Sequence, residues 1–316
     1  MKSKLLKVII CLLIAFFIAI TFLPKSLFSS KEVLFKVEKG EGSRAIALNL
    51  QKTGLITWSS AFRLYVLTIG VAGELQAGTY QLNSNMNIPE IAGIISKGKI
   101  AKEKITIIEG WTIRDIANYL EDKGLFTKEE ILELTGNPLD PNSMEGYLFP
   151  DTYLISKDVS AEDLITLMHD NFENKIQPYS AEMEEKGLSL SQVITMASLI
   201  EKEVKTMEDK QLVSGIYWKR IKYGYPLQSD SSIAYIKGVP QWRYSYEDTR
   251  IDSPYNTYLN YGLPPGPISN PGLDSIEAAL RPTESPYLYY LSTPQGDTIY
   301  SKTLAEHNAN IEKYLK

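Results

Sequence analysis

The first strong pattern in the chain is an uninterrupted apolar run over residues 8–23, preceded by Lys2, Lys4 and Lys7. A helix over this run spans about 24 Å, slightly short of a hydrocarbon core of about 30 Å, and snorkelling lysines make up the difference. The run therefore predicts a transmembrane anchor, with residues 1–7 as a cytoplasmic tail and the remainder of the chain outside. A cleavable signal peptide is the alternative, although no small-x-small cleavage site follows the run.

A second pattern repeats itself along the chain, because residues 37–57 match residues 107–127. The identical pairs are Gly40/Gly110, Arg44/Arg114, Ile46/Ile116, Ala47/Ala117, Leu50/Leu120, Gly54/Gly124, Leu55/Leu125 and Thr57/Thr127. Each copy predicts a strand, a glycine turn, an amphipathic helix and a glycine that ends the helix. A third, truncated copy is predicted over residues 88–98. Such units either serve packing alone or form a glycan-binding module, and the pattern leaves both interpretations open.

One amphipathic helix is predicted over residues 189–204, with Ser189 as N-cap and Gln192 completing a capping box. At about 100° per residue its apolar stripe includes Glu201, whereas Glu203 points away and is interpreted as solvated. Burial disfavours the charged form of a carboxyl, and a general acid must keep its proton near neutral pH. Glu201 is therefore the candidate acid. The alternative is a structural glutamate at the rim of the core, reaching water or a buried Arg.

Beyond residue 139 the chain is rich in Tyr, Pro, Gly and Asn between periodic segments. The predicted elements are helices near 161–175, 189–205 and 207–223, strands at 287–292 and 297–300, and a last helix at 303–315. Proline-rich loops such as residues 262–267 are too rigid for flexible linkers and are interpreted as fixed walls of a cleft. This C-terminal part is therefore predicted to be an α+β domain.

The composition of the chain argues against several kinds of partner and site. The net charge of −5 argues against nucleic acid as a partner. The sole cysteine, Cys11, lies in the apolar run, so the outer part has no disulfide and no thiol nucleophile. With only His169 and His307, a His-rich zinc site is excluded, and no metal or other cofactor is predicted. A Ser-His-Asp triad through His307 lacks a G-x-S-x-G elbow, so His307 is interpreted as structural.

Seven motifs in order carry a resemblance that covers nearly the whole chain. They are Glu145–Tyr153, Met196–Glu203, Pro226–Asp230, Tyr255–Tyr258, Gly262–Ile268, Asn270–Gly272 and Glu306–Asn308. In these motifs the sequence resembles the YceG-like family of endolytic murein transglycosylases. It departs from the family at Val204 and Ser231, which bear only on the shape of the neighbouring cleft.

The resemblance implies a domain order as well as an activity. It implies a LysM-like module over residues 33–100, a second related β-α unit or connector over 101–139, and a catalytic transglycosylase domain over 140–316. Together with the anchor over 8–23, this order predicts a single-pass protein of the cytoplasmic membrane, with its N-terminus inside and its α+β catalytic domain outside.

The implied reaction is cleavage of the β-1,4 bond between N-acetylmuramic acid and N-acetylglucosamine without water, which leaves 1,6-anhydro ends. Such an activity would terminate or trim nascent glycan strands. One acid suffices, because the C6 hydroxyl of the substrate is the nucleophile, whereas a hydrolase normally needs a second carboxylate. In this interpretation Glu201 protonates the glycosidic oxygen and then accepts the proton of that hydroxyl.

Five further residues are candidates for substrate binding. Gln228 and Asp230 are expected to hydrogen-bond sugar hydroxyls or the N-acetyl group, although Asp230 equally fits a helix cap or a second carboxylate. Asn256 and Tyr258 are expected to line a subsite, with Asn256 alternatively bracing its turn. Glu145 either supports a substrate-contacting residue from behind or anchors the N-terminal end of its own loop.

Two rival functions stay open at this point. One is a muramidase-type hydrolase that uses Glu201 with Asp230, and the other is a non-catalytic peptidoglycan-binding scaffold. A buried Arg facing Glu201, with no open cleft, would favour the scaffold, whereas a groove lined by Gln228, Asn256 and Tyr258 would count against it. The expected partners are peptidoglycan strands and the cytoplasmic membrane, with a cell-wall synthase as a further candidate.

Overall fold

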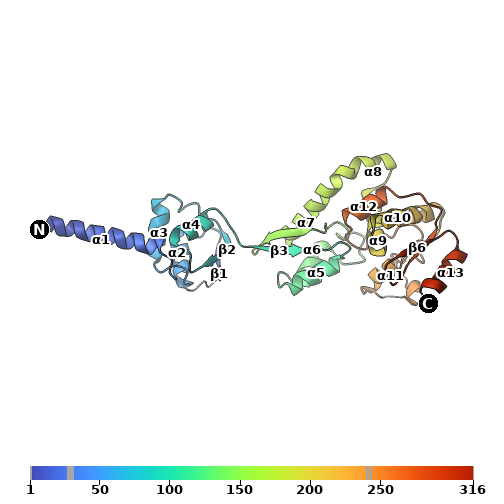
Figure 1. Cartoon of the computed structure of the whole chain (residues 1–316), viewed down its shortest axis with the longest axis horizontal. Helices are drawn as coiled ribbons and strands as arrows, with labels where there is room; N and C mark the ends of the chain where they lie inside the picture. The colour runs from blue at the N-terminus through green and yellow to red at the C-terminus, as the bar shows by residue number, and fades with distance from the viewer. Residues whose placement is uncertain (1, 27–31, 240, 242–243, 316) are drawn as a thin grey trace. The chain divides into compact units, whose positions relative to one another are not determined.

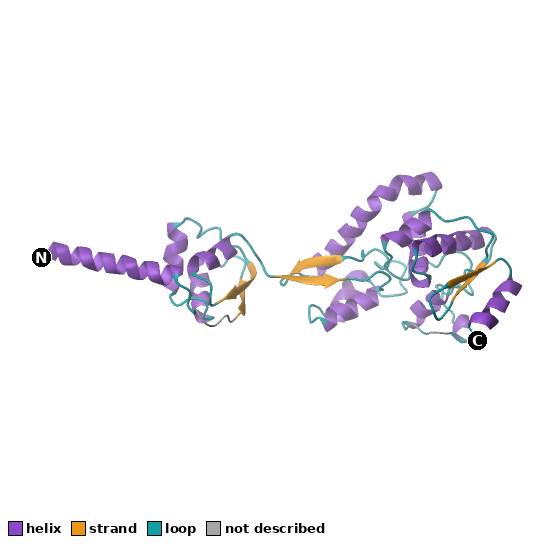
Figure 2. Cartoon of the chain, in the orientation of Figure 1, coloured by secondary structure: helices purple, strands orange, loops and turns teal. Residues whose placement is uncertain are grey.

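The computed structural model describes residues 2–26, 32–239, 241 and 244–315. It divides into two compact units, each of which is described by itself. The first comprises Met1–Ile105 and Leu154–Val159, and the second comprises Thr106–Tyr153 and Ser160–Lys316. Figure 1 labels the elements along the chain, and Figure 2 shows that helices predominate and that the strands are short.

The first unit contains a two-stranded antiparallel sheet and four helices. Strand β1 (Glu32–Val37) pairs with β2 (Gly78–Asn83). The helices are α1 (Lys2–Phe22), α2 (Ser43–Lys52), α3 (Ser59–Thr68) and α4 (Ile88–Ser96). Alternate strand positions and one stripe on each of α2, α3 and α4 are buried, as their periodicities require. They form a core that includes Phe35, Val37, Ile46, Leu50, Phe62, Val66, Tyr80, Leu82, Ile91 and Ile95.

Helix α1 contains the predicted apolar run. Its segment Lys4–Phe22 is the one helix in the described part of the chain that is long and apolar enough to cross a membrane. Its last turns pack against α3 and the residue before it, with ring centroids 5.5 Å apart for Phe16 and Trp58 and 6.4 Å apart for Phe22 and Tyr65. Length and composition alone fit an anchor or a signal sequence.

The predicted repeat corresponds to two equivalent strand–turn–helix segments. The first is β1 followed by α2, and the second is β3 (Lys102–Thr106) followed by α5 (Ile113–Asp122). Gly40 and Gly110 occupy the same position in the two turns, at φ values of 83° and 78° that glycine adopts without strain. Helix α4 matches the truncated third copy. The repeat is therefore confirmed as local structure, whereas the glycan-binding, LysM-like module stays a prediction.

The second unit holds most of the helices and the antiparallel strand pair of β5 (Tyr289–Ser292) and β6 (Thr298–Ser301). Strand β3 pairs with β4 (Thr152–Ser156), and most residues of both strands belong to the first unit. After α5 the helices are α6 (Lys128–Thr135), α7 (Ala161–Ile176), α8 (Ser180–Lys186), α9 (Leu190–Glu203), α10 (Met207–Lys222), α11 (Asp230–Lys237), α12 (Leu273–Leu280) and α13 (Leu304–Tyr314). Single 3-10 turns lie at Gln177–Tyr179 and Asp248–Arg250.

Helix α9 lies in the core of this unit. Ser189 and Gln192 exchange hydrogen bonds in the predicted capping box, which fixes the start of the helix. Residues 193–200 are all buried, because α10, α11 and α12 pack around α9 (Figure 1). A helix enclosed on every side is held firmly, and its last residue, Glu203, is therefore presented from a rigid support.

The predicted α+β class is confirmed, and so are the helices near 161–175, 189–205 and 207–223, the two C-terminal strands and the last helix. Helices α3, α6, α8, α11 and α12 were not predicted. They have seven to ten residues, so their apolar periodicity is too short to stand out. The predicted domain boundaries at 100/101 and 139/140 stay predictions.

Candidate active site

A cleft of about 670 Å³ opens in the second unit, within the size range of ligand pockets. Lys202 and Glu203 contribute the end of α9 to its wall, and residues of α10, α11, β5 and α13 complete it. The lining includes Arg220, Leu227, Gln228, Asp230, Gln241, Tyr258, Tyr289, Tyr290, Leu291, His307, Asn308 and Ile311. Within the described residues, no group of three or more His, Cys, Asp and Glu side chains is placed to hold a metal ion.

Glu203 ends α9 and presents its half-buried carboxyl group at the cleft wall. The Ser229 hydroxyl donates to Glu203 Oε1 at 2.5 Å, and the Ser231 hydroxyl donates to the same oxygen at 3.0 Å. Ser229 is the N-cap of α11, so the start of one helix orients the last side chain of another. The carboxyl group is thereby fixed in direction while it still reaches the cleft.

Glu201 lies on the apolar stripe as predicted, but it does not line the cleft. Its side chain is 9% exposed and forms an ion pair with Lys210, whose Nζ lies 3.4 Å from the carboxylate and whose side chain is 4% exposed. The same carboxylate accepts hydrogen bonds from the Gly272 N–H at 3.0 Å and the Ser275 hydroxyl at 2.7 Å. Glu201 therefore ties α9 to α10 and to the start of α12. Burial and this charge raise the pKa of the neighbouring Glu109.

Three of the five predicted substrate-binding residues line the cleft together: Gln228, Asp230 and Tyr258. The Tyr258 hydroxyl donates to Asp230 Oδ1 at 2.5 Å, and burial together with the Asp230 charge raises the pKa of Tyr258. Gln228 has a left-handed φ of 55°, which is uncommon for a residue other than glycine and is frequent at functional sites. Arg220 Nη1 donates to Gln228 Oε1 at 3.5 Å.

The other two predicted residues have structural positions. Asn256 is fully buried and donates through Nδ2 to the carbonyls of Thr249 and Ile251, so it braces its turn. Glu145 is 2% exposed and accepts hydrogen bonds from the Ile113 N–H, the first of α5, and from Asn270 Nδ2. Neither residue is part of the cleft lining, and their alternative interpretations as braces describe them better.

Burial raises the pKa of Glu145 from 4.5 to about 8, and this predicts a pH dependence of stability. The folded state keeps a proton that the unfolded state loses above pH 4.5, so stability falls as pH rises from about 5 to 8. Glu145→Gln is expected to remove this decline, which is on the order of a few kcal/mol. Urea unfolding of both proteins at several pH values measures it. Parallel curves for the two proteins would contradict the raised pKa.

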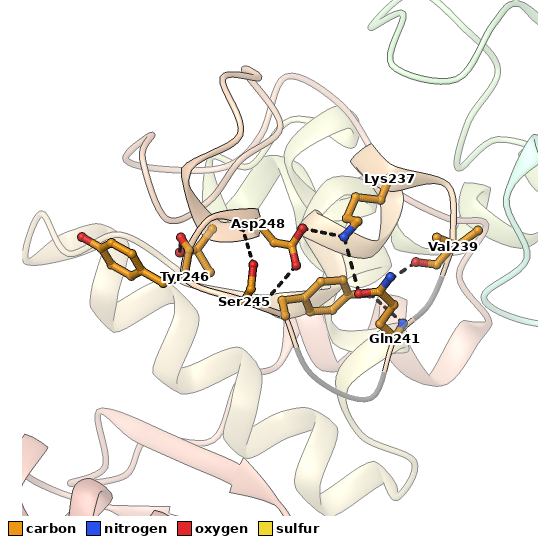
Figure 3. Close-up of polar contacts among 8 residues, drawn as sticks. Lys237, Val239, Gln241, Ser245, Tyr246 and Asp248 are labelled. Carbon is orange, nitrogen blue, oxygen red and sulfur yellow. Dashed lines mark hydrogen bonds and ion pairs between the residues drawn. The ribbon is translucent and has the colours of Figure 1, made fainter.

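The segment after α11 brings Gln241 to the cleft. Lys237 Nζ, from α11, donates to Gln241 Oε1 at 3.4 Å and to Asp248 Oδ1 at 2.5 Å (Figure 3). Asp248 Oδ2 in turn accepts from the Ser245 N–H at 2.9 Å. Lys237 and the Ser245 N–H together lower the pKa of Asp248. One lysine thus holds the rim residue and the 3-10 turn at Asp248–Arg250 in a common arrangement.

Sequence reasoning interpreted Glu203 as a solvated carboxylate and did not predict that it lines the cleft or that two serine hydroxyls hydrogen-bond to it. The helical wheel assigns a face, but it does not show that serines at the start of α11 lie against the last residue of α9. A serine within the Gln-Ser-Asp motif was the available signal. His307 was also interpreted as structural. It stacks on Tyr289 with ring centroids 5.4 Å apart and lines the cleft, and burial lowers its pKa.

Comparison with known proteins identifies the relatives of this chain. The YceG-like family matches residues 35–313. The endolytic murein transglycosylase of Bacillus subtilis is 35% identical over 310 residues, which cover 91% of this chain and 86% of that protein. The endolytic murein transglycosylase of Streptococcus pneumoniae serotype 2 is 30% identical over 332 residues, which cover 93% of this chain and 60% of that longer protein.

A solved structure supports the same relationship. The crystal structure of a yceG-like protein from Listeria monocytogenes superimposes with a TM-score of 0.62 at 34% sequence identity. The match covers 89% of this chain and all of that one (100%). Sequence and structure both match over most of the length, so the chain belongs to the YceG-like family.

Proposed function

We propose that this protein is a membrane-anchored endolytic lytic transglycosylase that cleaves the β-1,4 bond between N-acetylmuramic acid and N-acetylglucosamine in peptidoglycan. The activity that the Bacillus and Streptococcus relatives carry in their names supports the substrate and the reaction. The observation that carries the proposal is the Glu203 carboxyl group, which two serine hydroxyls orient in a cleft that also presents Gln228, Asp230 and Tyr258.

Glu203 fits the general acid better than Glu201 does. An acid must reach the glycosidic oxygen within hydrogen-bond distance, and Glu203 is the one of the two that lines the cleft. The Glu201 carboxylate is engaged with Lys210, Gly272 and Ser275, and Glu201 is not among the residues that line the cleft. The prediction that Glu201 is catalytic therefore stands as the rival that the experiment must exclude.

The reaction proceeds in two proton transfers. Protonated Glu203 gives its proton to the glycosidic oxygen while the C1–O bond breaks and charge develops at the muramoyl C1. The Glu203 carboxylate then takes the proton of the C6 hydroxyl, whose oxygen bonds to C1 and closes the 1,6-anhydro ring. Glu203 ends protonated and no water is consumed. Ser229 and Ser231 keep one carboxyl oxygen in place through both steps.

Gln228, Asp230 and Tyr258 serve as substrate contacts in this proposal. Gln228 offers an amide that donates to and accepts from sugar hydroxyls or the N-acetyl group. Asp230 is held by Tyr258, which suits a fixed acceptor for a sugar hydroxyl. A hydrolase is the second candidate, because Asp230 is another carboxylate in the same cleft and hydrolases of this kind use two.

Digestion products separate these two reactions. The full chain in detergent, incubated with purified sacculi, is expected to release fragments that end in 1,6-anhydro-muramic acid and lack a reducing end. Mass spectrometry checks this, because hydrolysis adds one water to each new end and borohydride then reduces that end. Reducible ends in place of anhydro ends would support the hydrolase with Asp230 as its second carboxylate.

The non-catalytic scaffold is the third interpretation. A buried basic residue does face Glu201, but it is Lys210 rather than an Arg, and it accompanies an open cleft. The cleft lining contains Gln228 and Tyr258, which counts against a scaffold, although Asn256 is not part of it. A scaffold has no need for a carboxyl group that two serine hydroxyls orient toward a cleft of ligand size.

The remaining parts of the proposal concern location and partners. Helix α1 with its lysine flank supports a single-pass anchor in the cytoplasmic membrane that leaves the second unit outside. The strand–turn–helix repeat supports a LysM-like module that binds glycan. An anchored enzyme outside that membrane would meet strands as they are made, which makes a cell-wall synthase a fitting partner.

A further inference from the structure

Helix α3 carries apolar side chains on two faces, and only one of those faces is buried. The inner face, which includes Phe62 and Val66, lies fully buried in the core of the first unit. The outer face carries Leu64 and Leu67, which are 52% and 54% exposed, and Trp58 just before the helix is 46% exposed. An apolar face that stays exposed beside a packed one marks an interaction surface.

The predicted anchor helix α1 lies directly against this surface. The Phe16 ring of α1 meets Trp58 edge to face, with ring centroids 5.5 Å apart, and Phe22 meets Tyr65 of α3 in the same way at 6.4 Å. Just beyond α1, the Ser26 N–H donates to the carbonyl of the residue that follows β2, at 3.1 Å. The last two turns of α1 therefore hold α3 at a fixed position along the anchor.

The apolar run of α1 sets the depth at which α3 meets a membrane. The run ends at Leu23, and Phe16 lies seven residues earlier, which is about 10 Å along a helix. A hydrocarbon core that takes in the whole run therefore extends past Phe16 and reaches the ring of Trp58. A span that ended before Phe16 would have only residues 1–15, about 22 Å of helix, and would include the three N-terminal lysines. That span is too short for a core of about 30 Å, so the membrane reaches α3.

The charges and aromatic side chains of this region suit the surface of a bilayer. Helices α2 and α3 contain three exposed basic residues, Arg44, Lys52 and Arg63, and no acidic residue. Basic side chains beside an apolar helix face are attracted to anionic lipids. Trp58 and Tyr65, which contact α1, are of the two residue types that are enriched where lipid headgroups meet acyl chains. Charge and residue type thus both favour lipid as the partner.

We propose that α3 and Trp58 form a membrane-docking surface, in which Trp58, Leu64 and Leu67 enter the outer leaflet beside α1 while Arg63 meets lipid phosphate groups. The inference rests on the membrane anchor in the proposed function, because α1 brings the bilayer to this surface. Its consequence is that α1 and α3 together hold the first unit on the membrane, so that this unit does not move freely about its anchor.

A fluorescent probe on α3 tests this in the full chain. Cys11→Ala removes the sole thiol, and Leu67→Cys or Leu64→Cys on that background then carries a polarity-sensitive probe. The protein is reconstituted into vesicles of phosphatidylcholine and phosphatidylglycerol, with or without lipid brominated in its acyl chains. Both probes are expected to show blue-shifted emission and to be quenched by brominated lipid. Leu34→Cys is the matched control and is expected to show neither effect, because Leu34 is 51% exposed on β1, on the side of this unit away from α1 (Figure 1).

The outcomes separate the docking surface from the function on which it rests. If the probes on α3 behave like the Leu34 probe in protein that an alkaline wash leaves in the vesicles, the docking surface is overturned and the anchor stands. A blue shift without quenching places protein rather than lipid over α3 and overturns it as well. If the alkaline wash removes the protein, the anchor fails and the docking surface fails with it. Release of 1,6-anhydro ends by the unlabelled chain tests the catalytic part of the proposed function independently.

Discussion

Replacing Lys210 with Met is expected to destabilise the second unit by roughly 3 kcal/mol, the lower end of the cost of removing one partner from a buried ion pair. The lysine and Glu201 side chains are 4% and 9% exposed, so solvent cannot take over the charge of the remaining carboxylate. The hydrogen bonds from Gly272 and Ser275 compensate it only in part. Urea unfolding followed by intrinsic fluorescence measures the loss.

Two further variants serve as controls for Lys210→Met. Lys222→Met alters an exposed lysine at the end of the same helix and is expected to change stability by less than about 0.5 kcal/mol. The double variant Glu201→Gln with Lys210→Met removes both charges and is expected to recover most of the loss, because no unpaired charge then stays buried. If Lys210→Met unfolded at the same urea concentration as the unmodified protein, the ion pair would have no structural role.

The sequence predicted those features that depend on nearby residues. The repeat at Gly40 and Gly110 was visible because the same turn needs the same residue type twice. Helix α9 was visible because Ser189 and Gln192 form its capping box over a long apolar stripe. The burial of Glu201 followed from the same periodicity. In each case the interactions lie within a few residues of one another along the chain.

The partners of the two glutamates could not be predicted in this way. Glu201 meets Lys210 in the next helix and Gly272 far along the chain, while Glu203 meets Ser229 and Ser231 at the start of α11. Periodicity shows which side of a helix is apolar, but it does not show what covers the end of that helix. The helical-wheel argument therefore assigned the catalytic role to Glu201, which is buried, and interpreted Glu203, which lines the cleft, as solvated.

Glu203→Gln is expected to lower the rate of glycan cleavage by about 10²–10⁴-fold, the usual contribution of general acid–base catalysis. Glutamine still accepts the hydrogen bonds of Ser229 and Ser231, so the end of α9 keeps its arrangement, but it can neither give nor take the proton. The thermal unfolding temperature should therefore stay near that of the unmodified protein while activity falls.

The release of 1,6-anhydro ends from purified sacculi by Glu203→Gln and Glu201→Gln, measured side by side by liquid chromatography and mass spectrometry, tests the central assignment most directly. We expect Glu203→Gln to release almost none. Glu201→Gln leaves Lys210 buried without its partner charge and is expected to be less stable, but the folded fraction is expected to retain activity within about tenfold of the unmodified protein. The opposite result, an inactive but folded Glu201→Gln beside an active Glu203→Gln, would return the catalytic role to Glu201 and contradict the account.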